Sequence, residues 1–343
     1  MNYNTTPSAT LDPVDRAIVD VLHRDGRAPW SRVAEQVNVS AATVRRRYET
    51  MHNQGVIRVI GATDVARLGL GTPIYMRLSN AHGDLDVLIP RLRSRKEVRS
   101  LNTLLGSVDI AAEMVLPPNA DHSRLVADIT KGTAATVETL LLTHAFASGQ
   151  DWAPPRDTDE PTRLAPVKTQ PAPPVELTRS EAKALGMLMH DGRTSLGDLA
   201  NAIGKSENTA SRTIDQLQEY GLLDFRILVE PERLGFGTEF LLWLEVEPQH
   251  LTETAISLSE HPSTKYLTAT TGSCSLAGQF IVRDRTELFH YSTQVLASLP
   301  GIRSADFSIQ TATHKRVWTS IEEGVYATAG QPLDPIEYLQ SHD

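Results

Sequence analysis

The chain of 343 residues is long enough for two to four small domains, and its 40% hydrophobic and 22% charged content is ordinary for a globular protein. The net charge of −9 is unevenly spread, with −1 in residues 1–160 and −8 in the remainder, so any contact with nucleic acid must be local. No run approaches the roughly 18 apolar residues of a membrane span, and no signal peptide is visible. The single cysteine, Cys274, excludes an intrachain disulfide. Together these features predict a cytoplasmic protein.

One segment organises the rest of the chain, because residues 11–57 recur as residues 177–223, an offset of 166. The turn Asp25-Gly26-Arg27 recurs as Asp191-Gly192-Arg193, and the same offset still relates Trp152 to Trp318. A constant offset over so long a stretch predicts a tandem duplication of one unit.

The first copy begins with three predicted helices. Apolar residues at positions 11, 14, 17, 18, 21 and 22 share one face of a helix over 11–24. A second helix is predicted over 30–37, and Ser40 is a good N-cap for a third helix over 41–54. Three short helices with a tight turn between the second and third are typical of a helix-turn-helix domain.

The third helix carries the candidate nucleic-acid contacts. In a helix-turn-helix the start of this helix enters the major groove, where arginine bridges phosphates or binds the O6 and N7 atoms of guanine. We therefore predict that double-stranded DNA is bound by Ser40, Ala41, Thr43, Arg45, Arg46 and Arg47. The alternative is a solvated basic face on an ordinary surface helix.

Residues 58–152 alternate between strand and helix patterns. Strands are predicted over 73–79, 98–105, 110–116 and 137–146, with helices over 84–95 and 119–131. This βαββαβ order is ferredoxin-like. The residues Gly106-Ser107-Val108-Asp109 join the second strand to the third.

A proline-rich segment separates the two copies. Seven of the 24 residues in 153–176 are proline, so this segment is predicted to be a stiff, extended linker. The second copy then supplies a helix-turn-helix domain over 177–226 and a ferredoxin-like domain over 227–320. The polar tail over 321–343 is expected to be partly disordered or to pack on a neighbour. The predicted fold class is α+β.

The combination resembles the Lrp/AsnC family of transcriptional regulators. The resemblance is carried by the pattern Leu-Asp-x-x-Asp-x-x-Ile-x-x-x-Leu at 11–22, by the Asp-Gly-Arg turn, and by the Gly-x-x-Asp turn at 106–109. It implies a DNA-binding domain over 1–60 and a ligand-sensing and oligomerisation domain over 61–152. Ordinary members have one such unit and dimerise, so this chain looks like two fused units.

The resemblance also implies an effector site. In the family, small effectors, often amino acids, bind near the Gly-x-x-Asp turn at interfaces between ferredoxin-like domains. It therefore implies ligand contacts for Thr103, Leu104, Gly106, Ser107, Val108 and Asp109, with Gly272 and Ser273 in the second copy. Glycine backbone N–H groups could hold a carboxylate, and Asp109 could pair with an ammonium group. Alternatively, Gly106 and Asp109 simply make a hairpin turn.

The two copies have diverged at both predicted sites. The arginine triplet becomes Ser211-Arg212-Thr213, which leaves Ser206, Thr209 and Arg212 as the second set of DNA contacts. Asp109 becomes Ser275, which puts an equivalent second effector site in doubt. The first copy is therefore expected to dominate both DNA binding and effector binding.

Two other functions fit the same pattern. Fused relatives include sirohaem decarboxylases, which carry His and Arg near the second and third strands, but the stretches 100–105 and 110–115 contain neither. A protein-interaction role is possible if both helix-turn-helix units have degenerated. The 11 histidines show no close ligand pair, so no metal, cofactor or catalysis is predicted.

Association of the sheets is the last expectation. Each ferredoxin-like sheet has an apolar face that two helices cannot cover, so the two sheets are predicted to pair face to face, within one chain or between chains. We also expect a homo-oligomer, a dimer or larger.

Overall fold

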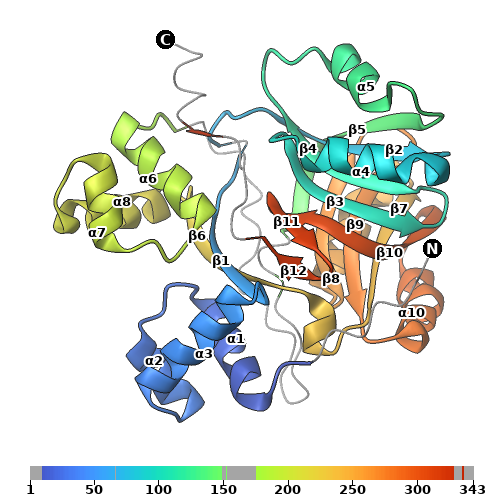
Figure 1. Cartoon of the computed structure of the whole chain (residues 1–343). Helices are drawn as coiled ribbons and strands as arrows, with labels where there is room; N and C mark the ends of the chain where they lie inside the picture. The colour runs from blue at the N-terminus through green and yellow to red at the C-terminus, as the bar shows by residue number, and fades with distance from the viewer. Residues whose placement is uncertain (1–9, 66, 149–151, 153–174, 328–333, 336–343) are drawn as a thin grey trace.

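A computed structural model describes residues 10–65, 67–148, 152, 175–327 and 334–335 (Figure 1). Two helical heads lie beside a barrel of strands, and the remaining helices lie on the outside of the barrel. The predicted linker falls outside the described residues apart from Val175 and Glu176. Among the described residues, no helix has the length and apolar content that crossing a membrane requires.

Each head is a bundle of three short helices whose starts are fixed by side-chain caps. The first comprises α1 (Pro13–Arg24), α2 (Trp30–Val37) and α3 (Ala41–Asn53), and the second comprises α6 (Arg179–His190), α7 (Leu196–Ile203) and α8 (Glu207–Glu219). Asp12 caps α1 and Ser40 caps α3, while Thr178 and Glu181 form a capping box at α6. The predicted helices of the first head therefore differ from the observed ones by at most two residues.

A two-stranded sheet lies between the heads. Strand β1 (Ile57–Ala62) pairs antiparallel with β6 (Asp224–Val229), and Ile57 lies opposite Val229. All six residues of β1 are buried. The two strands are equivalent segments of the two repeats, so this pairing relates the heads by an approximate two-fold axis.

The barrel consists of two ferredoxin-like halves. The first half has strands β2 (Thr72–Ser79), β3 (Val98–Leu105), β4 (Ile110–Leu116) and β5 (Thr136–Ala147), with helices α4 (Leu85–Arg93) and α5 (His122–Thr130). The second half has strands β7 (Thr238–Val246), β8 (Thr264–Thr270), β9 (Leu276–Val282) and β10 (Ile302–Arg316), with helices α9 (Leu251–Glu260) and α10 (Arg285–His290). Short helical turns complete it: η1 (His82–Asp84), η2 (Pro231–Leu234), η3 (Pro248–His250), η4 (Tyr291–Val295) and η5 (Leu296–Ser298). Both halves have the strand order of the predicted βαββαβ fold.

The two halves join at their edges into a closed barrel. Strand β5 pairs with β8 and strand β10 pairs with β3, while β10 also pairs with β7. The inner faces of both sheets share one apolar cluster, in which Tyr75 contacts Trp243 edge to face at 5.5 Å. The expected face-to-face pairing therefore occurs within one chain. Since the inner faces are already buried, the reason we gave for association between chains no longer applies, and the homo-oligomer stays a prediction.

Each head packs against the opposite repeat. The core of the first head includes Ile227, Val229, Leu234 and Phe236 of the second repeat. The core of the second head includes Val65, Leu68, Leu70 and Val115 of the first repeat. The two repeats are therefore interlocked, as the two subunits of a domain-swapped dimer would be.

The start of the predicted tail is ordered. Strands β11 (Thr319–Glu322) and β12 (Val325–Tyr326) extend the sheet beyond β10. Tyr326 is only 1% exposed, and its backbone N–H donates to the carbonyl oxygen of Gly55 in the first head at 2.8 Å. The first residues of the tail therefore pack against their own chain. Positions 328–333 and 336–343 lie outside the described residues.

Candidate nucleic-acid interface and ligand-binding site

The start of α3 presents an exposed polar surface. The Ser40 hydroxyl accepts a hydrogen bond from the N–H of Thr43 at 3.1 Å, which fixes where the helix begins. Arg45 and Arg46 are both exposed, and Arg45 forms an i,i+4 ion pair with Glu49 at 2.8 Å. An exposed pair of this kind contributes little to stability, so Arg45 can exchange Glu49 for a phosphate at small cost.

Arg47 has a different environment from its two neighbours. Its guanidinium donates to Asp12 at 2.6 Å and to Asp15 at 2.9 Å, both at the start of α1. The hydrogen bonds to Asp12 and Asp15 raise the pKa of Arg47 above its ordinary value. Arg47 therefore ties α3 to α1, a role that the sequence analysis missed because Asp12 and Arg47 lie far apart in the chain.

The second head offers a weaker surface for DNA. Ser206 caps α8 through the N–H of Thr209, and Arg212 is exposed. Thr213, at the position of Arg47, is 7% exposed and donates its hydroxyl to the carbonyl of Thr209. The exposed side of α8 also carries acidic side chains, at Glu207, Asp215 and Glu219. These carboxylates oppose contact with phosphate.

The predicted effector turn packs against the other half of the barrel. A Cβ atom at Gly106 would lie 2.9 Å from the carbonyl oxygen of Phe307 in β10, so only glycine fits there without a shift. The Ser107 hydroxyl donates to Asp306. Thr103 forms a hydrogen bond with His314, whereas Leu104 and Val108 lie in the apolar cluster inside the barrel. The structure therefore places all these residues at the contact between the two halves of the barrel.

Asp109 is engaged in the turn itself. One carboxylate oxygen accepts the N–H of Ala81 at 2.7 Å, and the other lies 2.9 Å from Nε2 of His82. Ser275, at the equivalent position, accepts the N–H of Val246 at 2.8 Å. Both residues thus tie a hairpin turn to the end of the neighbouring strand, which favours the alternative in which Asp109 is structural.

Arg77, which was not among the predicted site residues, links the two turns, because it lies 3.9 Å from Asp306, which accepts a hydrogen bond from Ser107 of the first turn. Arg77 donates to Ser273 at 3.0 Å and to Glu138 at 2.9 Å, and it lies 4.4 Å above the ring of Trp243. Gly272, with a φ of +93°, packs against Leu140 of the first half. A charged residue within an otherwise apolar strand was the available signal.

A cavity of about 90 Å³ lies between the β1–β6 sheet and the barrel strands. Its wall combines equivalent positions of the two repeats, namely Arg99 with Lys265, Glu113 with Gln279, Tyr75 with Leu241, and Ser100 with Tyr266. The cavity therefore lies close to the approximate two-fold axis. Arg99 lies one residue before the stretch 100–105 but belongs to β3, so the expectation that this strand carries no arginine is wrong.

Comparison with known proteins identifies the family. A model of the AsnC-type helix-turn-helix domain matches residues 11–52, and a winged helix-turn-helix DNA-binding model matches residues 177–224. The transcriptional regulator AldR of Mycolicibacterium smegmatis is 30% identical over 141 residues, which cover 39% of this chain and 82% of AldR. The chain belongs to the Lrp/AsnC family. The Lrp/AsnC regulator FL11 of Pyrococcus horikoshii is 25% identical over 142 residues, which cover 41% of this chain and 93% of FL11.

These relatives each span about one repeat, so this Lrp/AsnC chain holds two family units. Since both heads match DNA-binding models and the relatives are named transcriptional regulators, the chain is a DNA-binding regulator. A crystal structure of the siroheme decarboxylase NirDL covers 96% of this Lrp/AsnC chain and 99% of its own, with a TM-score of 0.59 and 12% identity. That likeness shows a shared fold for the whole interlocked arrangement.

Proposed function

We propose that this chain acts in the cytoplasm as a regulator with a family dimer fused into one polypeptide, and that it binds double-stranded DNA chiefly through its first head. The observation that carries the proposal is the contrast between two equivalent helices. Helix α3 exposes Arg45 and Arg46, whereas α8 exposes Arg212 among Glu207, Asp215 and Glu219. Phosphate contacts by Lys and Arg dominate DNA affinity, so this contrast favours the first head.

A fused dimer differs from an ordinary one in what it can bind. Two identical heads match a palindromic site because the symmetry of the protein is mirrored in the DNA. Two unequal heads at fixed spacing match an asymmetric site, with one half-site bound more tightly. We therefore propose that the operator has one well-defined half-site, which the first head reads.

The test uses a duplex selected from random DNA by the purified full chain. Fluorescence anisotropy then compares wild type with an Arg45→Ala, Arg46→Ala double variant and with Arg212→Ala as the matched control in the second head. A base-reading arginine is expected to cost about 1–3 kcal/mol, and a phosphate-contacting one lowers the salt slope by about 1. A greater loss from Arg212→Ala than from the double variant would contradict the proposal.

We also propose that the regulator responds to a small effector bearing a carboxylate, such as an amino acid. One relative of known structure, the transcriptional regulator NMB0573 of Neisseria meningitidis, is described as a complex with L-Met. In the present chain the polar atoms of the Gly106–Asp109 turn already bond to other residues. This leaves open a second location for the effector.

We further propose that the chain acts by binding and not by catalysis. The DNA-binding heads and the named regulators among its relatives support this proposal. The fold shared with a siroheme decarboxylase supplies the opposing case. Absorption spectra of sirohaem titrated with the purified protein test whether the tetrapyrrole binds. Binding followed by release of carbon dioxide from the tetrapyrrole would show that the chain is an enzyme.

A further inference from the structure

We infer that the cavity between the β1–β6 sheet and the barrel is the effector site, and that it takes a small molecule bearing a carboxylate. The inference rests on the proposed effector response, but it places the ligand away from the hairpin turns. At about 90 Å³ the cavity exceeds several-fold the roughly 10–15 Å³ that one water requires, so its size suits a small metabolite.

The wall of the cavity includes a buried hydrogen-bond donor without a partner in the described part of the chain. This donor is the Nε atom of Arg99. Tyr75 and Asn102, which line the same cavity and are 4% and 5% exposed, bring further polar groups close to it. Buried polar groups normally find partners, so the Nε atom of Arg99 points to an acceptor supplied by a ligand.

The cationic side chains of the wall are preformed donors for an anionic group. Four cationic side chains line the cavity, Arg99, Arg226, Lys265 and Arg316. Each already pairs with a carboxylate, that of Glu113, Asp224, Glu239 or Glu230 respectively, so a ligand carboxylate would compete with these partners. Arg99 already pairs with Glu113 at 2.6 Å, and Lys265 pairs with Glu239 at 3.3 Å, so the cations are held in place before ligand arrives. Charge-assisted hydrogen bonds to a carboxylate are short and strong, and preformed donors raise affinity because they need little ordering.

The rest of the wall indicates the body of the ligand. Tyr75, Tyr266 and Trp152 supply aromatic surface beside the donors. His23 also lines the cavity, and burial lowers its pKa to about 4, so it contributes a neutral ring. An apolar wall with a few convergent donors is the usual composition of a small-molecule site. The geometry thus suits a carboxylate attached to an apolar group.

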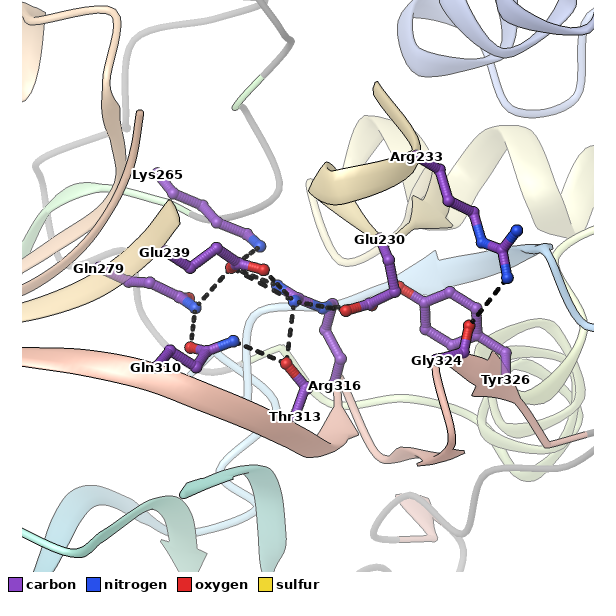
Figure 2. A network of polar contacts seen from close by, with 10 residues as sticks. All are labelled: Glu230, Arg233, Glu239, Lys265, Gln279, Gln310, Thr313, Arg316, Gly324 and Tyr326. Carbon is purple, nitrogen blue, oxygen red and sulfur yellow. Dashed lines mark hydrogen bonds and ion pairs between the residues drawn. The ribbon is translucent and has the colours of Figure 1, made fainter. Parts of the chain in front are cut away.

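A chain of polar contacts starts at Arg316 in the wall of this cavity and reaches Tyr326 (Figure 2). Arg316 lines the cavity and pairs with Glu230 at 3.1 Å and Glu239 at 3.0 Å. The hydroxyl of Tyr326 donates to the same Glu230 at 2.5 Å. Burial alone would lower the pKa of Arg316, but Glu230 and Glu239 more than offset it and raise that pKa. Arg316 is therefore positively charged and pairs with two carboxylates. A ligand carboxylate in the cavity would compete with them for Arg316.

The contacts of Tyr326 complete the route. Its backbone N–H donates to the carbonyl of Gly55, which lies two residues beyond the end of α3. Arg58 of β1 donates to the carbonyl of Ala327 at 3.0 Å. A ligand that draws Arg316 into the cavity weakens its pairing with Glu230, and Glu230 holds Tyr326. Such a ligand regulates DNA binding if it binds more tightly to one arrangement of β12 against the first head than to another.

Ligand binding is tested first, without DNA. The probes are the standard amino acids, their 2-oxo acids and, as controls lacking the carboxylate, their amides, each titrated by calorimetry up to about 10 mM so that a Kd of ~1 mM is detected. At least one carboxylate is expected to bind wild type while its amide does not. Amino acids and 2-oxo acids separate a zwitterionic ligand from a simple anion. Failure of every carboxylate to bind overturns the inference.

Variants then locate the site. Asn102→Asp places a negative charge beside the ligand and is expected to weaken binding at least about tenfold, and Tyr75→Phe several-fold. Circular dichroism checks that each variant is folded. Ser107→Ala in the hairpin turn is the matched control and should leave affinity unchanged. A loss with Ser107→Ala but not with Asn102→Asp would place the effector at the turn and refute the cavity.

Coupling to DNA is tested last. Tyr326→Phe removes the hydroxyl that binds Glu230 and leaves the cavity wall intact. This variant should bind the ligand as wild type does, while the effect of ligand on DNA affinity, expected to be roughly 5–150-fold in wild type, disappears. A full ligand effect in Tyr326→Phe overturns the route. Since ligand and DNA are measured separately, failure of DNA binding in the absence of ligand would count only against the proposed function.

Discussion

Arg27 and Arg193 occupy equivalent positions in the two repeats, and each donates hydrogen bonds to the Asp-Gly-Arg turn of the other head. Arg27 donates to the carbonyl of Gly192 at 2.8 Å, and Arg193 donates to the carbonyl of Gly26 at 2.6 Å. Arg193 also lies 3.7 Å above the ring of Trp30. This exchange fixes the spacing of the two heads, and thereby the spacing of the half-sites that they can reach.

We predict that Arg193→Ala destabilises the protein by about 2–4 kcal/mol, because it removes two charged hydrogen bonds and a cation–π contact. Denaturant unfolding followed by far-UV circular dichroism measures the change. The control is Arg32→Ala, whose exposed pair with Asp25 contributes little. Equal effects from Arg193→Ala and Arg32→Ala would show that the exchange does not stabilise the heads.

Neutralising the second head should strengthen DNA binding. A Glu207→Gln, Asp215→Asn double variant removes exposed negative charge from α8. Repulsion between exposed charges is screened over about 10 Å at 0.1 M salt, so the gain should be largest at low salt. Anisotropy at several salt concentrations tests this, with Glu253→Gln, Glu260→Gln on α9 as the matched control. A similar gain from the control would mean that net charge alone, and not the second head, is responsible.

His23 should make the protein less stable in acid. Burial lowers the pKa of His23 in the folded chain to about 4, from 6.5 when unfolded, so the unfolded state binds the extra proton. Stability contributed by neutral His23 is present above pH 6.5 and is lost as the pH falls towards 4, by about 3 kcal/mol in all.

His23→Asn tests this pH dependence, since its amide can still donate to the carbonyl of Val19, which now contacts Nδ1 of His23. Unfolding free energies measured between pH 7 and 4 should fall less steeply in the variant. His314, whose pKa is lowered to about 4 by burial and by Arg93, contributes to the residual slope, as do His52 and His261, whose pKa values burial also lowers. Identical slopes in wild type and variant would show that His23 is not held neutral.

The docking of β12 requires glycine at position 55. Gly55 has a φ of +67°, and a Cβ there would lie 2.6 Å from the carbonyl oxygen of Tyr326. Gly204 has a similar φ of +65° but nothing near its Cβ position. Gly204→Ala should therefore cost only the backbone strain of about 1–2 kcal/mol, and Gly55→Ala about 1–3 kcal/mol more. Thermal unfolding measures both, and equal losses would argue against close docking of β12.

The two hairpin turns should respond alike to loss of their polar residues. Asp109→Ala leaves the buried N–H of Ala81 without an acceptor, and Ser275→Ala does the same to the N–H of Val246. Each is expected to cost about 1–3 kcal/mol. The asymmetry that we inferred from sequence predicts instead that only Asp109→Ala alters effector binding. Calorimetry of both variants alongside unfolding separates a structural role from a ligand contact.

The sequence by itself determined the local structure and the family. Caps such as Ser40, the turn around Gly26 and the alternation of apolar residues act within a few residues, so they predicted the helices and strands of the first copy within a few positions. The constant offset between Arg27 and Arg193 showed the duplication.

The tertiary structure alone decided which parts of the two copies meet. Nothing local distinguishes a head that packs on its own repeat from one that packs on Ile227 and Phe236 of the other, because both choices bury similar apolar surface. The same holds for Arg47, Asp109 and Arg99, whose roles depend on partners brought close by the closed barrel and the exchanged heads. These contacts join residues that lie far apart in the sequence. The sequence shows each residue of such a pair, but it does not show that the two residues meet.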